Sequence, residues 1–337
     1  MLSLHHDSQE RESKCAATRA TLRRADNYPS FGARSLAWVR LSKRRAASKP
    51  APRLTDKLLI ISSKAGSITP AIEATLRKAF ADHTIVEFDP ENDFRELLEP
   101  KARVVAAGGD GTIGFVARAL IDADHTLGIL SLGTYNNFAK ALGLPASLAG
   151  GIRVIKTGIP HRITVGKVGG TSFLEAAAVG MFGAAIELGE AIKDNKFGEL
   201  GQKLALVTGA KPFRYDITGD IKGHGMAMSL VFANTPSIGA AMPVADANPL
   251  DSFLELSVHA GASRHDIVGR LITGRMFSPR EHPLEMGFRF RKLTVTTKPK
   301  VEVYADNRKV GTTPLEISAH LGALNILLPR KVLPPRG

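Results

Sequence analysis

Two glycine-rich segments contain the residue types that bind phosphate. The first, Gly108-Gly109-Asp110-Gly111-Thr112, follows the apolar run Arg103–Ala107 and opens a stretch of helical spacing. Glycine lets the backbone approach an anion closely, and the N–H groups and dipole at a helix start favour negative charge. We therefore predict that this segment cradles a phosphate. The alternative is a tight strand-to-helix turn that needs positive φ.

The second segment runs from Ser131 to Ala139 and leaves an apolar run in the same way. The side chains of Thr134 and Asn136 can donate hydrogen bonds to a phosphate or a nucleotide. Neither segment is followed by Gly-Lys-Ser/Thr, as a Walker A loop would be, and neither fits the spacing GxGxxG. Together, the two segments favour a phosphate site more strongly than either does alone.

The elements that must position these segments alternate between strand and helix patterns from residue 54 onward. Thr69-Pro70 has the form of an N-cap followed by a first-turn proline. The predicted strands are Leu58–Ile61, Thr84–Phe88, Arg103–Ala107 and Leu127–Ser131, and the predicted helices are Ile72–Phe80, about Asn92–Leu98, Ile113–Ile121 and Phe138–Leu142. Such alternation implies right-handed crossovers and a mainly parallel sheet, with ligands beyond the carboxyl ends of its strands.

Beyond residue 160 the pattern changes to predominantly strand-like runs. Two helical stretches, at about 184–194 and 263–273, interrupt them. The predicted strands are Ile163–Val168 and Ser172–Ala177 as a hairpin around Gly169-Gly170, then Met226–Phe232, Phe253–Val258, an alternating stretch from Phe288 to Val295, and Leu324–Leu328. The chain is therefore predicted to combine an α/β part with a β-rich part.

The positive charge of the chain lies mostly in its first 53 residues. The 337 residues carry a formal net charge of +13, of which residues 1–53 contribute +8, with 12 Lys and Arg against four Asp and Glu. This segment has no sustained hydrophobic pattern, so we predict a largely disordered basic tail. It is solvated, an arm attracted to anionic lipid, or a transit peptide. The remaining +5 shows no basic stripe among aromatic residues, so we predict no nucleic-acid partner.

Two further counts exclude whole classes of protein. The single Cys15 excludes an intramolecular disulfide and a cysteine-based zinc module, and a reducing compartment is the default. No stretch approaches the ~20 consecutive apolar residues that span a bilayer. Any membrane contact is therefore expected to be peripheral.

The two segments together resemble the catalytic domain of diacylglycerol and sphingosine kinases, in particular its bacterial lipid-kinase branch. NAD kinases and phosphofructokinases share GGDG, but the second block, LGTYNNFAKALGLP, is much more specific. The resemblance continues through Phe173-Leu174, Gly180–Gly183, Pro249–Glu255, Tyr304–Asp306 and Ala323–Pro329, and covers about residues 57–330. It implies a NAD-kinase-like N-terminal α/β domain, a C-terminal β-sandwich domain and an active site in the interdomain cleft.

The resemblance also implies domain boundaries. Residues 54–160, with a returning segment at about 313–331, would form the nucleotide-binding α/β domain. Residues 161–312 would form the β-rich lipid-substrate domain. Residues 1–53 would remain outside both.

Site residues follow residue by residue from the same resemblance. Gly108 to Thr112 and Thr134 match the positions that bind ATP. Asp251 matches an aspartate that holds Mg²⁺, together with the backbone carbonyls of Asn248 and Phe253. Asp306 matches the proposed base that removes the proton of a lipid hydroxyl, and Asp110 is the competing candidate.

The chain departs from the family pattern at several of these positions. Asn137 replaces the aspartate of the second segment, Ser252 replaces the glycine after the metal-site aspartate, and Asn307-Arg308 replace Gly-Glu after Asp306. Gly114-Phe115 stands where Asn-Glu is usual. Arg308 would reverse a charge beside the proposed base.

The resemblance implies a phosphotransferase with an alcohol acceptor. It would transfer the γ-phosphoryl group of ATP, with Mg²⁺, to a hydroxyl of diacylglycerol or a similar lipid at a membrane surface. The alternatives are a catalytically weakened lipid-binding or regulatory relative, and a NAD kinase. The predicted location is cytoplasmic, including a peripheral position at the inner membrane surface. The sequence leaves the lipid and the oligomeric state open.

Overall fold

The computed structural model describes the chain in seven stretches. They are residues 54–62, 68–182, 211–239, 242–243, 245–259, 287–306 and 308–330. The predicted tail at 1–53, the helices predicted at about 184–194 and 263–273, and Asn307 lie outside these residues.

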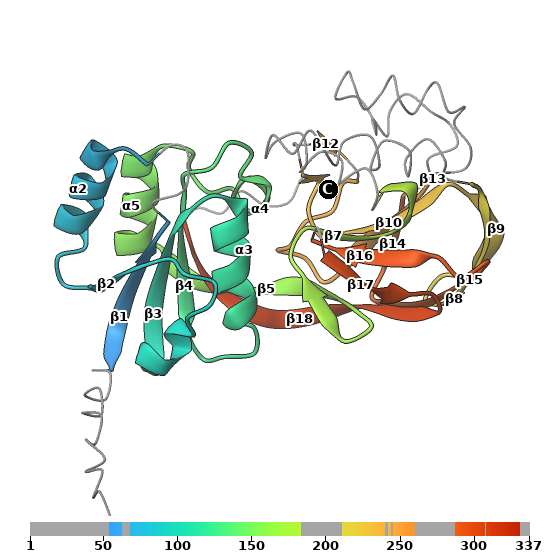
Figure 1. Cartoon of the computed structure of the whole chain (residues 1–337), viewed down its shortest axis with the longest axis horizontal. Coiled ribbons are helices and arrows are strands. Elements are labelled where there is room, and N and C mark those ends of the chain that lie inside the picture. The colour runs from blue at the N-terminus through green and yellow to red at the C-terminus, as the bar shows by residue number, and fades with distance from the viewer. Residues whose placement is uncertain are drawn as a thin grey trace, which may run out of the picture. The chain divides into compact units, whose positions relative to one another are not determined.

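Parallel strands and the helices between them form the first part of the fold (Figure 1). The strands are β1 (Thr55–Ile61), β2 (Thr84–Glu87), β3 (Leu98–Gly108) and β4 (Thr126–Ser131), in the order β2-β1-β3-β4. The helices are α2 (Pro70–Ala79), the 3-10 turn η1 (Phe94–Leu97), α3 (Asp110–Ala119), α4 (Asn137–Ala141) and α5 (Leu148–Thr157). The predicted α/β part is confirmed.

Successive side chains of β1 alternate between two buried faces of the sheet. Leu58 and Ile60 belong to one core with α3, whereas Leu59 and Ile61 belong to another with α2 and α5. Figure 1 shows α2 and α5 on one side of these strands and α3 on the other. A strand that is buried on both faces needs a continuous apolar run, which is the pattern of this segment.

One predicted helix starts where its sequence signals indicate, and another is much shorter than predicted. The Thr69 hydroxyl accepts a hydrogen bond from the Ile72 N–H at 3.3 Å, and Pro70 occupies the first turn of α2, as predicted. The helix predicted at about Asn92–Leu98 is wrong in extent, because only the turn η1 forms there. Leu98 instead pairs with Thr55 and begins β3.

A long last strand continues the sheet into the β-rich part. β18 (Leu315–Leu328) pairs in parallel with β4 and antiparallel with β5 (Ile159–Val168) and β15 (Lys292–Lys298). Its course is visible in Figure 1. The sheet goes on through β8 (Phe213–Gly219) and β9 (Gly223–Ala227), while β6 (Thr171–Phe173) pairs with β5.

A second, antiparallel sheet packs against this extension. Its order is β14 (Gly287–Phe290), β13 (Leu254–His259), β10 (Ser229–Ala233), β7 (Ala176–Gly180), β16 (Glu302–Ala305) and β17 (Arg308–Thr312). A pair of short strands, β11 (Ser237–Ile238) and β12 (Met242–Pro243), lies apart. One core joins Val295 and Ile317 of the large sheet to Phe232 and Leu256 of the second. The predicted β-rich part is confirmed as two packed sheets.

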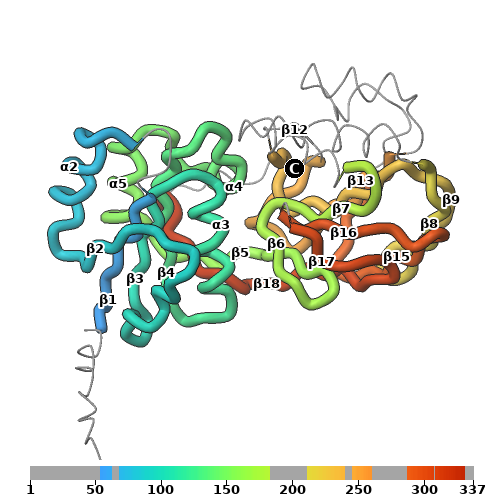
Figure 2. The backbone as a smooth tube through the Cα atoms, viewed as in Figure 1, coloured from blue at the N-terminus to red at the C-terminus, as the bar shows by residue number. Residues whose placement is uncertain are grey.

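Three predicted strands are each two strands in the structure. Ser172–Ala177 breaks at Leu174-Glu175, Met226–Phe232 breaks at Met228, and the stretch from Phe288 to Val295 breaks at Arg291. At every break the chain crosses from one sheet to the other, and Figure 2 follows the backbone through these crossings. Each crossing is only one or two residues long, so the strand pattern resumes at once and the two strands look like a single run in the sequence.

Candidate active site

The two glycine-rich segments touch through their backbones. A Cβ atom on Gly133 would lie 2.7 Å from Gly109 Cα and 2.8 Å from Asn136 Oδ1, closer than real Cβ contacts. One segment follows β3 and the other follows β4, and these strands are parallel neighbours. Adjacent strand ends thus bring both predicted phosphate-binding segments together, and glycine permits their close approach.

Asn136 and Asp110 lock the two segments to each other. Asn136 has a left-handed backbone with φ +52°. Its Oδ1 accepts from the Gly133 N–H at 3.0 Å, and its Nδ2 donates to the Gly133 carbonyl at 2.8 Å. Its own N–H donates to Asp110 Oδ2 at 2.8 Å. The structure therefore gives both side chains a role in holding the loops.

The start of α3 presents backbone rather than side chains. Its N-cap is Gly109, which supplies no side-chain hydrogen bond. Gly111 is exposed, and a Cβ there would meet nothing within 4 Å. Thr134 is exposed as well, whereas Thr112 is buried against Gly108. An exposed, glycine-rich helix start suits an anion.

The Asp306 carboxylate accepts hydrogen bonds from donors in distant parts of the chain. Its Oδ2 accepts from the Leu174 N–H at 2.7 Å and Arg118 Nη1 at 3.2 Å, and its Oδ1 accepts from the Glu175 N–H at 2.9 Å. Its backbone is left-handed, with φ +40°, and its N–H donates to the Ala176 carbonyl at 3.0 Å. A carboxylate has about four lone-pair positions, so roughly one remains for a substrate hydroxyl.

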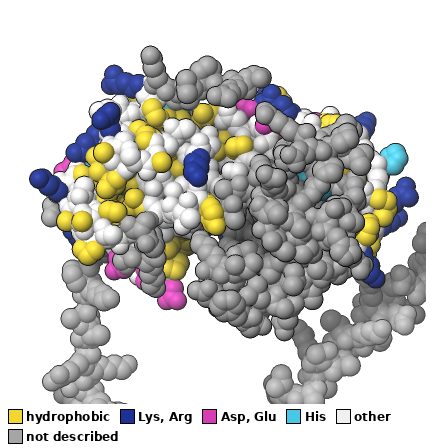
Figure 3. Space-filling view, turned by 90° about the horizontal axis from the view of Figure 1, so that it is seen from above, with side chains coloured by type: hydrophobic (Ala, Val, Ile, Leu, Met, Phe, Trp, Pro, Cys, Tyr) yellow, Lys and Arg dark blue, Asp and Glu magenta, His cyan; other side chains and the backbone are white. Residues whose placement is uncertain are grey.

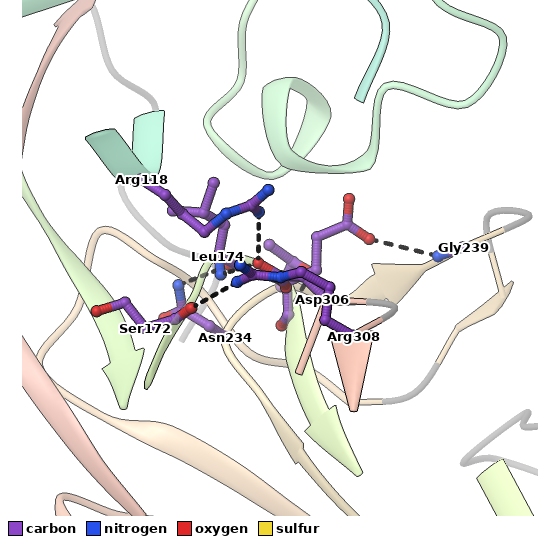
Figure 4. A network of polar contacts seen from close by, with 9 residues as sticks. Arg118, Ser172, Leu174, Asn234, Gly239, Asp306 and Arg308 are labelled. Carbon is purple, nitrogen blue, oxygen red and sulfur yellow. Dashed lines mark hydrogen bonds and ion pairs between the residues drawn. The ribbon is translucent and has the colours of Figure 1, made fainter. Parts of the chain in front are cut away.

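Arg118 joins the two halves of the candidate site. It lies on α3, the helix that begins at Asp110, and its ion pair reaches Asp306 beside β16 (Figure 4). The side chains of Arg118 and Asp306 are 22% and 10% exposed. Burial lowers the pKa of Arg118, and the nearby Asp306 carboxylate opposes this shift. Arg308, which the sequence placed beside Asp306, directs its guanidinium to the Ser172 carbonyl at 3.4 Å.

Glu175 is a buried carboxyl group that the sequence analysis missed. Its Oε2 accepts from Asn137 Nδ2 and the Gly239 N–H, both at 3.3 Å. Burial, together with the negative charges of Asp306 and Asp110, raises the pKa of Glu175 to about 8. Its only signal in the sequence is an acidic residue between the apolar runs of β6 and β7.

The predicted magnesium residues lie in one loop before β13. The Asp251 N–H donates to the Asn248 carbonyl at 3.1 Å, and the Phe253 N–H donates to Asp251 Oδ1 at 2.8 Å. Asp251 Oδ2 is paired with Arg289, whose guanidinium also lies 4.6 Å from the centre of the Phe253 ring. A carboxylate and carbonyls suit Mg²⁺ chemically. However, the positively charged Arg289 guanidinium occupies Asp251 Oδ2 and would repel a cation, so this arrangement does not fit a bound metal, and we assign no step to one here.

A buried amide connects the Asp251 loop to the Asp306 cluster. The Thr164 hydroxyl donates to the Asp251 carbonyl at 2.5 Å. Asn234, fully buried, donates from Nδ2 to the carbonyls of Thr164 at 3.1 Å and Leu174 at 2.9 Å. Leu174 in turn donates its N–H to Asp306. Figure 4 shows Asn234 close to Leu174 and Asp306.

Across the part of the chain that the structure describes, no helix is long and apolar enough to cross a membrane. The same residues contain no cluster of three or more His, Cys, Asp or Glu side chains arranged to hold a metal ion.

The fold and these contacts define a class of protein: a parallel α/β sheet with a glycine-rich candidate anion site, joined to a β-sandwich that carries a buried carboxylate. Among solved structures, a putative diacylglycerol kinase from Bacillus anthracis has this fold. The TM-score is 0.63 at 22% identity, over 82% of this chain and 99% of that one. The diacylglycerol kinase catalytic domain matches residues 58–168.

Curated relatives make the assignment more specific. A probable YegS-like lipid kinase of Pseudomonas fluorescens is 30% identical over 252 residues, 69% of this chain and 79% of the relative. An uncharacterized Synechocystis protein is 26% identical over 238 residues, and the matched region spans only 54% of its length. The chain belongs to the YegS-like lipid kinase family.

Proposed function

We propose that this chain transfers the γ-phosphoryl group of ATP to a hydroxyl of diacylglycerol or a similar lipid at a membrane surface. The observation that carries the proposal is the contact between Arg118 and Asp306. Through it, the helix that begins at the glycine-rich loop and the carboxylate of the β-rich part form one cluster. Membership of a lipid kinase family supports the substrate class.

In the proposed reaction the residues divide the work by position. The backbone from Gly108 to Gly111, with Thr134, binds the nucleotide phosphates, and Asp110 and Asn136 keep the loops in register. Asp306 accepts the proton of the lipid hydroxyl while the hydroxyl oxygen attacks the γ-phosphorus, and ADP leaves. Mg²⁺, entering with ATP, would offset the phosphate charge. The predicted metal residues Asn248, Asp251 and Phe253 take no part in the proposed reaction, because Arg289 pairs with Asp251.

Membrane access in this proposal is peripheral. Figure 3 shows Lys and Arg side chains scattered among hydrophobic ones on the described part of one face. Such a mixture suits contact with anionic lipid headgroups. The proposal places the protein in the cytoplasm and at the inner membrane surface.

The test is transfer of labelled phosphate from ATP to a panel of lipids in mixed vesicles. We expect lipid phosphorylation by the wild type and its loss in Asp110→Ala and Asp306→Asn. Transfer that survives both substitutions would reject the residue assignment. Turnover of NAD with no lipid product would instead favour the NAD kinase alternative.

One observation favours a second candidate, a lipid-binding relative with weakened catalysis. Three donors already occupy the Asp306 carboxylate, which restricts its access to a substrate proton. This candidate predicts saturable ATP and lipid binding by the wild type with no labelled lipid product in the same assay.

A further inference from the structure

Glu175, in the crossing between β6 and β7, makes hydrogen bonds through its N–H, its carbonyl and its carboxyl group. Its N–H donates to Asp306 Oδ1, and its carbonyl accepts from the N–H groups of Asn234 at 2.8 Å and Thr235 at 3.1 Å. Its carboxyl group accepts from Asn137 and Gly239. One residue therefore contacts the base candidate, the second glycine-rich segment and the segment that leads to β12.

Asn137 connects Glu175 to the second glycine-rich segment, which the proposed function assigns to nucleotide binding. This amide is almost completely buried, and its Nδ2 also donates to the Gly239 carbonyl at 2.8 Å. Its Oδ1 accepts from the Ser237 hydroxyl at 3.3 Å. Asn137 directly follows Asn136, which is bonded to Asp110. A change in the charge of Glu175 can therefore affect the hydrogen bond between Asn136 and Asp110 through two successive residues, Asn137 and Asn136.

The charges that face Glu175 come from two elements. Asp110 and Arg118 belong to α3, and Asp306 follows β16, while the hydrogen-bond partners Asn137 and Gly239 carry no charge. Arg118 forms its ion pair with Asp306. Burial and the two carboxylates raise the pKa of Glu175 to about 8, so the group is mostly protonated at neutral pH.

We propose that Glu175 is a protonated positioning residue: it accepts the hydrogen bond of Asn137 and, as a neutral acid, adds no charge beside Asp110, Asp306 and a bound nucleotide. Loss of its proton adds a third negative charge to this cluster. The added charge repels the phosphates of the nucleotide and the carboxylates of Asp110 and Asp306. This inference rests on the proposed function for its nucleotide, and it concerns how that site depends on pH.

The first test measures nucleotide binding, which does not require transfer. We expect the Kd of a fluorescent ATP analogue to rise several-fold between pH 7 and pH 9.5 in the wild type. Glu175→Gln, which is neutral at every pH, should flatten this rise. Glu302→Gln is the matched control, because Glu302 lies at the far end of β16, paired with Lys309. An equal rise in the wild type and Glu175→Gln would overturn the proposal.

The second test is thermal stability, which is independent of any ligand. Native Glu175 keeps its proton to a higher pH than the unfolded chain does. Between about pH 4.5 and 8 the native state therefore binds more protons, and stability falls as pH rises. The Tm of the wild type relative to Glu175→Gln should fall through this window and level off above it. A constant Tm difference from pH 5 to 9 would contradict the proposal.

A third measurement keeps the proposal testable if Glu175→Gln does not fold. Wild-type protein labelled with ¹³C at glutamate carboxyls should show one signal that titrates with a midpoint near pH 8. The absence of such a signal would overturn the proposal. If Glu175→Gln folds and binds ATP but transfers nothing at any pH, Glu175 is itself the base, and the positioning role is rejected. If the wild type binds ATP without transfer, only the proposed function fails.

Discussion

The two sides of the candidate site are assembled over very different distances along the chain. On the side that we propose binds the nucleotide, made of the two glycine-rich segments and called the nucleotide side, the bond from Asn136 to Asp110 spans 26 residues. On the acceptor side, the contacts of Asp306 with Glu175 and Arg118 span 131 and 188 residues. Neighbouring parallel strands are enough to form the first side. The second side requires both sheets to be folded and packed.

This difference predicts different weaknesses. The nucleotide side depends on backbone fit between two loops, so it is sensitive to added atoms. The acceptor side depends on buried polar contacts between elements, so it is sensitive to removed donors. The substitutions that follow probe each kind of weakness.

The largest effect is expected from Asn234→Ala. This change removes the amide that serves the carbonyls of Thr164 and Leu174, and each buried carbonyl left without a donor costs ~1–3 kcal/mol. We expect a loss of about 2–4 kcal/mol in denaturant unfolding. Asn325→Ala, at a less buried amide that donates to Thr126, is the control and should cost no more than about 1.5 kcal/mol. Equal losses of unfolding free energy in Asn234→Ala and Asn325→Ala would show that the acceptor side is not especially sensitive to the removal of a donor.

Gly133→Ala should have the next largest effect, on the nucleotide side. The new Cβ would lie within 2.7 Å of Gly109 Cα, so one backbone must shift, at about 1–3 kcal/mol. We expect weaker binding of an ATP analogue together with a lower Tm. Gly111→Ala adds a methyl group where nothing lies within 4 Å, so its Tm should be unchanged or slightly higher. A Gly133→Ala protein with wild-type Tm and ATP affinity would show that the loops do not need this contact.

The smallest effect on stability is expected from Arg289→Gln. The Arg289 side chain is 55% exposed, and exposed ion pairs contribute about 0–1 kcal/mol. The same change frees Asp251 and should tighten binding of Mn²⁺, a probe for Mg²⁺, in calorimetry. Tight Mn²⁺ binding by nucleotide-free wild type that Arg289→Gln leaves unchanged would show that Arg289 does not compete with a metal.

The nucleotide side could be predicted from the sequence because its determinants are contiguous. Apolar strands such as β1, glycines at the close approach and Thr69-Pro70 at a helix start each carry a local signal. Helix α5 was missed although Ser147 caps it, because Gly150 and Gly151 within it reduce helix propensity.

The acceptor side could be predicted only in part. Asp306 was found through the family resemblance, but its partners were not. Glu175 has only the weak signal of an acidic residue between apolar runs, and Arg118 has none, since their roles arise where the chain crosses between sheets and where a helix end meets a distant strand. The crossings at Leu174, Met228 and Arg291 were also missed, because each is only one or two residues long.

The central claim is that Arg118 joins the two sides into one catalytic unit. A double-mutant cycle with Arg118→Gln and Asp306→Asn, measured as kcat for lipid phosphorylation, tests it most directly. Asp306→Asn alone should lower kcat by about 10²–10⁴-fold, the usual contribution of a general base. The account predicts that the double variant is no slower than Asp306→Asn, because residues that act as a unit are not additive. Independent, multiplicative losses would contradict it.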